Sequence, residues 1–207
     1  VIGRCPVVTT ATKVVAGNCP VTPPFPTVAE PIRIAAGGNV NDDAAGTGTR
    51  KILVLGLDTN MDVISEEIVT AGISASAYTS QSFFRINRIK CLDPGVYGGL
   101  NIGDISVENT SGLVMSFVPT GFGKSTGSMW SVPRNFTGYL LRIKVSIAST
   151  KPVNARLFIR EEADKVVAPF GATRFLWSVD ERENEVSEHF DSNRIINEKS
   201  DLWIETE

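Results

Sequence analysis

The fold is decided by the stretch Gly46-Thr-Gly-Thr-Arg-Lys-Ile-Leu-Val-Leu-Gly-Leu57 and the residues that directly follow it. A glycine-containing loop leads into an apolar run, residues 51–57, that is too short and too rich in branched side chains to favour a helix. The polar turn Asp58–Asp62 follows, and residues 63–69 then alternate between apolar and polar side chains. This pattern predicts a β-hairpin. Its first strand is apolar on both faces and is expected inside a covered sheet, whereas the charged second strand is expected nearer a surface.

The same alternation of strand and glycine- or proline-marked turn recurs along the rest of the chain. Helical periodicity is weak throughout, and the charged segment 180–193 is predicted to be a loop because it has few apolar anchors. Many short strands at close spacing are typical of sandwiches and jelly rolls. We therefore predict an all-β fold, an antiparallel β-sandwich of jelly-roll type. Beyond the hairpin, its strands are expected at 32–34, 83–89, 104–108, 113–118, 139–147, 153–160, 175–179 and 201–205.

Composition excludes several classes of function. The 207 residues are 42% hydrophobic and 21% charged, which is ordinary for a globular protein. A net charge of −3 argues against a nucleic-acid partner, which would need a basic face. No apolar run approaches the roughly 20 residues that a membrane span requires. Residues 1–6 also lack the charged-then-apolar layout of a signal peptide.

Residues 1–31 differ in character from the rest of the chain, and the sandwich domain is expected to occupy residues 32–207. Six prolines interrupt any regular element in the first segment, and Pro23-Pro24-Phe25-Pro26 favours an extended polyproline conformation. Two interpretations stay open: an extended arm laid over a neighbour or over its own domain, or a mobile leader. The six prolines are Pro6, Pro20, Pro23, Pro24, Pro26 and Pro31.

The three cysteines do not make a disulfide scaffold. Cys5 and Cys19 would close a small loop in an oxidising compartment, and two free thiols are an equal alternative. Cys91 is expected to be a small buried apolar residue. With one histidine and no close cysteine pair, no structural zinc site is predicted.

Three motifs resemble parts of known binding or catalytic sites, but each favours a structural interpretation. Thr120-Gly-Phe-Gly-Lys-Ser125 resembles the end of a phosphate-binding loop but lacks its first glycine and a following helix. Asp58–Asp62 matches the first ligand positions of an EF-hand loop, without its glycine or its final glutamate. His189 stands among acidic residues, and no nucleophile elbow accompanies it. We therefore predict no catalytic, cofactor-binding or metal-binding residue, and no enzyme activity.

Glycines and aromatic residues in these loops and strands carry two further expectations. The loop glycines should occupy turns, several with positive φ, and should not surround a ligand. A carbohydrate-binding module for attachment to a host surface is the alternative function, and it would need exposed, coplanar rings among Tyr97, Trp130, Trp177 and Trp203. Asn109 and Asn135 begin formal glycosylation sequons, which matter only in a secretory pathway. The loop glycines are Gly46, Gly48, Gly98, Gly99, Gly121 and Gly123.

Several motifs in a fixed order give the chain a family resemblance from about Ile32 to its C-terminus. It resembles a β-rich structural-protein domain found in virions of tailed phages and other large viruses, especially aquatic ones. The residues that carry the resemblance are Asn41-Asp-Asp-Ala-Ala-Gly-Thr-Gly-Thr-Arg50, Gly56-Leu-Asp58, Ile64-Ser-Glu66, Phe83-Phe-Arg-Ile-Asn-Arg88, Gly98-Gly-Leu-Asn-Ile-Gly-Asp104, Pro119-Thr-Gly-Phe-Gly123 and Glu198-Lys-Ser-Asp201.

The resemblance implies a non-enzymatic component of a virus particle. Such a component would be capsid-associated (a decoration, minor capsid or fibre protein) or tail-associated. It would act by self-assembly and by packing on other virion structural proteins, with a homotrimer as the favoured oligomer. No cofactor, nucleic acid or membrane is expected as a partner.

Large apolar side chains point to the same kind of function. Phe83, Phe84, Trp177 and Trp203 exceed what one β-domain needs, and exposed aromatic residues usually mark a partner surface. The expected interface residues combine the proline-rich arm with two of these rings. They are Pro23, Pro24, Phe25, Pro26, Trp177 and Trp203.

Overall fold

A computed structural model of the protein describes residues 14–15, 25–145, 153–182 and 186–206. Within these ranges all regular structure is β, all paired strands are antiparallel, and no helix of the length and apolarity of a membrane span occurs. The predicted all-β, antiparallel fold class is confirmed. The strands are β1 Val14–Val15, β2 Glu30–Ile34, β3 Thr49–Leu57, β4 Val63–Val69, β5 Ser82–Phe83, β6 Arg85–Pro94, β7 Ile105–Asn109, β8 Val114–Val118, β9 Trp130–Ser131, β10 Gly138–Val145, β11 Val153–Arg160, β12 Thr173–Arg182, β13 Val186–Ile196 and β14 Asp201–Thr206.

The predicted hairpin is present as β3 and β4, which pair in register from Lys51 opposite Val69 to Leu57 opposite Val63. Its turn is stabilised by an aspartate side chain, as is common in turns, because the Asp58 carboxylate accepts hydrogen bonds from the N–H groups of Asn60 and Asp62. The first strand, β3, is central, with β4 on one side and β6 on the other. The charged strand β4 lies at the edge of this sheet, as expected.

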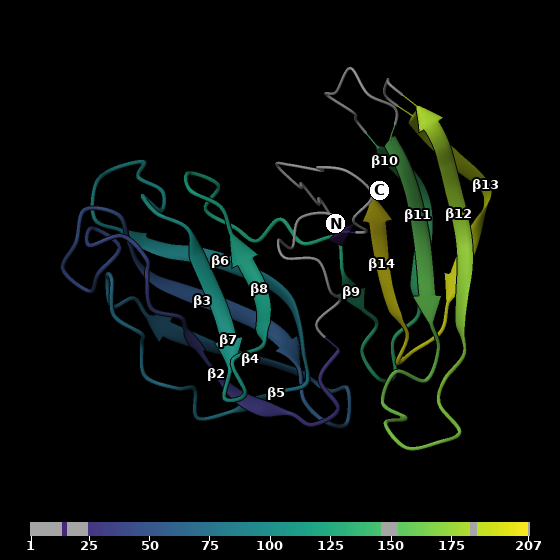
Figure 1. The fold of residues 1–207 in the computed structure, drawn as a ribbon, viewed down its shortest axis with the longest axis horizontal. Helices are drawn as coiled ribbons and strands as arrows, with labels where there is room; N and C mark the ends of the chain where they lie inside the picture. The colour runs from purple at the N-terminus through teal and green to yellow at the C-terminus, as the bar shows by residue number, and fades with distance from the viewer. Residues whose placement is uncertain (1–13, 16–24, 146–152, 183–185, 207) are drawn as a thin grey trace.

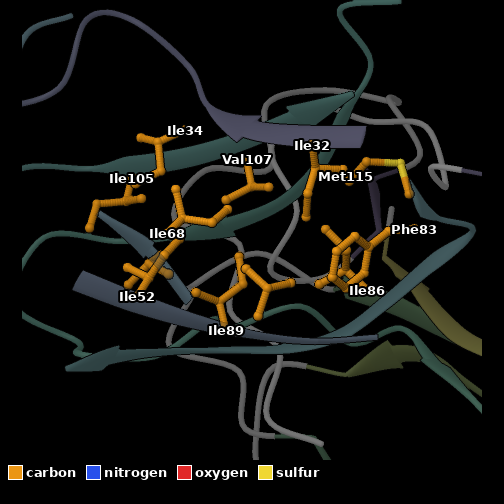
Figure 2. Close-up of a cluster of buried hydrophobic side chains, with 12 residues drawn as sticks. Ile32, Ile34, Ile52, Ile68, Phe83, Ile86, Ile89, Ile105, Val107 and Met115 are labelled. Carbon is orange, nitrogen blue, oxygen red and sulfur yellow. The ribbon is translucent and has the colours of Figure 1, made fainter. Parts of the chain in front are cut away.

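Strands β2 to β8 form two sheets, in the orders β5-β2-β7-β8 and β4-β3-β6, which we call the N-terminal sheets. Side chains from both sheets point into one apolar core (Figure 2). Residues just after β8 continue the pairing to β6, since Cys91 N donates to Gly123 O and Ser125 N to Ile89 O. The sheets therefore curl around the core as an open half-barrel (Figure 1). The core residues are Ile32, Ile34, Ile52, Val54, Ile68, Phe83, Ile86, Ile89, Ile105, Val107, Met115 and Val118.

The C-terminal sheets lie beside this half-barrel (Figure 1). β14 pairs with β11 on one side and with β1 and β9 on the other, and β11 also pairs with β12. β10 and β13 form a separate two-stranded ribbon. A second apolar core joins the ribbon to the larger sheet through Ile143, Leu157 and Trp177.

The prediction of a loop at 180–193 is wrong. β12 extends to Arg182, and β13 runs from Val186 to Ile196 in antiparallel register with β10. The sequence there has few apolar anchors, so the strand depends on its pairing with β10. The paired residues lie between 41 and 58 positions apart, and a local sequence pattern does not reveal such a pairing.

Candidate interaction site

Three loops that carry resemblance motifs, residues 41–50, 98–104 and 119–123, are joined by hydrogen bonds of the Asp42 and Asn101 side chains. The Asp42 carboxylate is buried and accepts backbone N–H groups from two loops. Thr49 N donates to Oδ1 at 2.8 Å, and Gly103 N donates to Oδ2 at 2.7 Å. Ile102 N lies 3.0 Å from both oxygens. Asp42 thus joins the loop of residues 41–50 and the loop of residues 98–104 into one hydrogen-bonded unit.

Asn101 ties the third motif into the same unit. Its buried side-chain amide donates to the carbonyl oxygens of Gly103 and Pro119, each at 2.8 Å. Its Oδ1 accepts Gly123 N at 2.9 Å, and its backbone oxygen accepts Gly121 N at 2.9 Å. The loops are therefore held by their own buried polar side chains.

Glycine is required at several of these positions. A Cβ at Gly48 would lie 2.2 Å from Asp42 Oδ1, so a side chain there would displace the carboxylate. Gly98, Gly121 and Gly123 have φ of +70°, +74° and +63°, which confirms that several loop glycines adopt positive φ.

Large apolar side chains stand exposed on these loops, and we call this set the loop-end surface. Tyr97 is fully exposed. Val40 lies beside Gly72, next to Ile73, and the Leu100 side chain lies beside Gly123, next to Phe122. The loop-end surface consists of Val40, Ile73, Val96, Tyr97, Leu100, Ile102 and Phe122.

Carboxylates on the same loops are held within the chain. Asp104 accepts both the backbone N–H and the hydroxyl of Thr120 at 2.8 Å. Asp43 accepts Ala45 N at 3.1 Å. No group of histidine, cysteine and acidic side chains suited to a metal ion occurs among the described residues.

The stretch that resembles a phosphate-binding loop is a connection between strands. Gly121 N and Gly123 N donate to Asn101, and Phe122 N donates to Pro119 O. Ser125 N donates to Ile89 O in β6. Because these N–H groups are already bonded within the chain, the loop does not present them to a phosphate.

A buried charge cluster lies where the N-terminal and C-terminal sheets meet. Asp201, at the start of β14, is 0% exposed and receives Arg85 Nε at 3.1 Å and Arg85 Nη2 at 3.1 Å. Arg160 Nη2 and Ser131 Oγ also donate to it, at 2.6 Å and 2.5 Å. Burial lowers the pKa of the Arg85 guanidinium, and the charge of Asp201 opposes that change. The four residues come from β6, β11, β9 and β14, so the cluster joins both sets of sheets.

Two expected interface residues, Phe25 and Pro26, lie against this cluster within the same chain. The Phe25 ring packs edge-on against Trp203 at 5.0 Å and lies under the Arg160 guanidinium at 4.1 Å. Pro26 O accepts Arg85 Nη1 at 3.2 Å. Phe25 and Pro26 thus contact their own domain. β2 begins at Glu30, two residues before the expected domain boundary.

The expectation of exposed rings is wrong for Phe83, Phe84, Trp177 and Trp203. Trp177 and Trp203 are 8% and 5% exposed, and Phe83 and Phe84 are fully buried. Trp177 belongs to the core of the C-terminal sheets, and Trp203 stacks on Phe158 at 5.5 Å. Among the candidate rings for a carbohydrate platform, Trp177 and Trp203 are therefore inside the protein, whereas Tyr97 and Trp130 are exposed. Pro23 and Pro24 lie outside the described residues, and their role as interface residues stays a prediction.

Other residues singled out from the sequence make contacts within the fold. Asp62 forms an ion pair with Arg134 at 2.8 Å and is not free to bind calcium. Asn109, the first sequon residue, is buried and accepts Leu113 N through its side chain. Cys91 is half-buried, and burial raises the pKa of its thiol. Cys5, Cys19 and the side chain of His189 lie outside the described part of the chain.

Sequence reasoning missed the loop-end surface and the two buried side chains that support it. Asp42 and Asn101 were part of the quoted motifs, but the sequence does not show that they reach each other's loops. An exposed apolar surface could have been predicted from Val96, Tyr97 and Leu100. They are large apolar residues inside a glycine-rich turn, where polar residues are usual.

Comparison with known proteins gives no further identification. The chain matches no protein-family model, no curated protein and no solved structure.

Proposed function

We propose that this protein is a structural component of a virus particle, capsid-associated or tail-associated, that works by self-assembly and by packing on neighbouring virion proteins. The observation that carries the proposal is the unit around Asp42 and Asn101. It gathers three of the resemblance motifs into one ordered platform whose outward side chains are apolar. Such a platform fits a protein whose role is contact with neighbours.

The proposal includes the finer fold, a jelly-roll type of sandwich. It is supported by the shared core of the N-terminal sheets and by pairings between strands distant in the sequence, such as β2 with β7 and β3 with β6. Return connections of this kind are typical of Greek-key and jelly-roll folds.

The proposed function is tested by the mass of the protein in solution and by imaging. Light scattering at micromolar concentration is expected to give a mass several times 22.3 kDa, with a trimer favoured. Electron micrographs should then show symmetric particles. A protein that stays monomeric, alone and with the other proteins of its particle, would overturn the proposal.

A further inference from the structure

We propose that the loop-end surface is a contact between copies of this chain, so that its occupant is a second copy. This inference rests on the proposed function, because it names the surface through which self-assembly occurs. Its evidence is the apolar area of the surface, its charge and its rigidity.

The exposed area is large enough for a stable contact. Seven large apolar side chains are between 38% and fully exposed. With about 150–250 Å² for a full aromatic side chain and less for an aliphatic one, these fractions amount to on the order of 700 Å² over the loops. A typical stable interface buries about 800 Å² on each partner. Monomeric proteins rarely expose patches above about 300–600 Å², so a surface of this size favours a partner.

Charge allows the partner to be another copy. Asp43 and Asp104, the acidic residues beside the surface, accept hydrogen bonds from their own loops. Lys51, near the start of the central strand β3, lies between Glu67 at 3.4 Å and Asp93 at 3.5 Å. The side chains of the loop-end surface are themselves uncharged, and the remaining charges of Asp43 and Asp104 are exposed to screening by salt, so the surface can face a copy of the same net-negative protein.

The surface is also ordered before it meets a partner. Asp42 and Asn101 fix the loops through bonds to Ile102, Gly103 and Gly123, so little conformational entropy remains to be lost on association. Tyr97 is fully exposed at a turn next to the positive-φ Gly98. Tyrosine is enriched among the residues that dominate binding energy, and we assign Tyr97 this role.

The molecule has a second, smaller group of exposed apolar residues that provides a matched control. Val166, Val167 and Phe170 lie in the connection between β11 and β12. Ion pairs flank this connection, Lys165 with Glu162 and Lys199 with Asp164. Phe170 is an exposed aromatic residue, and the connection that carries it belongs to the C-terminal sheets (Figure 1), whereas the loop-end surface belongs to the N-terminal sheets. Its substitution therefore removes a similar side chain outside the proposed contact.

The experiment measures mass against concentration by light scattering for wild type, for the double variant Tyr97→Ser/Leu100→Ser and for the control Phe170→Ser. The double variant is expected to raise the dissociation constant at least about tenfold, whereas the control should match wild type. Both positions are exposed, and circular dichroism checks that each variant is folded. A wild type that associates together with an unchanged double variant would overturn the inference alone. A wild type that is monomeric alone would also overturn the inference, and one that stays monomeric with the other proteins of its particle would overturn the proposed function as well.

Salt dependence gives a second, independent measurement. An apolar contact should persist when the salt concentration rises from about 0.1 M to 1 M, a range over which exposed charge pairs are screened. An assembly that dissociates over this range would show that charges hold it, and would overturn the inference. A loss of association in Phe170→Ser that leaves the double variant unaffected would place the contact on the C-terminal sheets instead.

Discussion

At the level of single residues, the buried Asp201 carboxylate shows how the two sets of sheets are held. It faces two guanidinium groups, Arg85 and Arg160, and each would be left without its counter-charge if the carboxylate were lost. Removing one partner of a buried ion pair is far more costly than replacing the whole pair, because a desolvated charge remains.

We expect Asp201→Ala to lower the free energy of unfolding by about 3–5 kcal/mol, as is typical for a broken buried pair. The measurement is chemical denaturation followed by fluorescence. Asp180→Ala is the matched control, because Asp180 pairs with Arg156 at 3.9 Å on the surface. Exposed pairs of that kind contribute at most about 1 kcal/mol. Equal losses in the two variants would contradict a special role for the buried cluster.

Asp42 makes a second prediction at this scale. Asp42→Ala would leave the N–H groups of Thr49, Ile102 and Gly103 without their acceptor, at about 1–3 kcal/mol for each donor that stays buried. The variant should be less stable and should associate more weakly, since the loop-end surface would lose its support. The neighbouring Asp43→Ala removes only the bond to Ala45 and should change little. Unchanged association in a folded Asp42→Ala protein would separate the surface from the proposed support.

At the level of elements, strand β4 is fixed at the sheet edge by Glu66. Burial alone would raise the pKa of this carboxyl, but hydrogen bonds from Ser80 and Gln81 outweigh it and the pKa lies below its ordinary value. A lowered pKa means that the stabilisation is present at neutral pH and is lost as the pH falls through the folded-state pKa. Glu66→Gln should therefore be less stable than wild type at pH 7 and nearly equal to it in acid. Thermal melts at several pH values check this, and a constant difference would contradict it.

The N-terminal segment gives a prediction about truncation. Removing residues 1–24 takes away β1, a two-residue strand paired with β14, and should leave the fold intact while weakening assembly. Extending the deletion through Phe25 and Pro26 removes the ring over Arg160 and an acceptor of Arg85, so stability should fall by about 2 kcal/mol or more. Circular dichroism and denaturation of both truncations test the difference. Loss of the fold in the shorter deletion would contradict the expectation.

Strands could be predicted where their sequence pattern is local. Sites built from residues distant in the sequence could not be predicted. The hairpin of β3 and β4 follows from an apolar run, an aspartate turn and an alternating run, all within 21 residues. β13 has no such signal, and its strand conformation depends on β10. The unit around Asp42 depends on bonds between residues 60 positions apart, and the Arg85–Asp201 pair spans 116 positions. A single sequence shows each of these residues but not the distances between them.

At the level of the whole molecule, the N-terminal and C-terminal sheets cover apolar and charged groups of each other, which would be exposed if the sheets were separated. Leu57, Met61 and Phe84 from the N-terminal strands and their turn pack with Ala163, which follows β11. Asn87 in β6 and Ser131 in β9 exchange two hydrogen bonds of 2.8 Å. Separating the sheets would expose this cluster and leave Arg85 without its counter-charge, while Asp201 would keep Arg160 as a partner within the C-terminal sheets.

We therefore predict that the protein unfolds in one cooperative transition in scanning calorimetry, with equal calorimetric and van't Hoff enthalpies. The physical reason is that the apolar cluster around Met61 and the Arg85–Asp201 pair are lost together when either set of sheets opens. Asp201→Ala should broaden the transition or divide it in two, since it weakens the junction more than either core. The control Asp180→Ala should keep a single transition. Two separate transitions in the wild type would show that the sheets fold independently, and the buried cluster would then be a contact between autonomous domains.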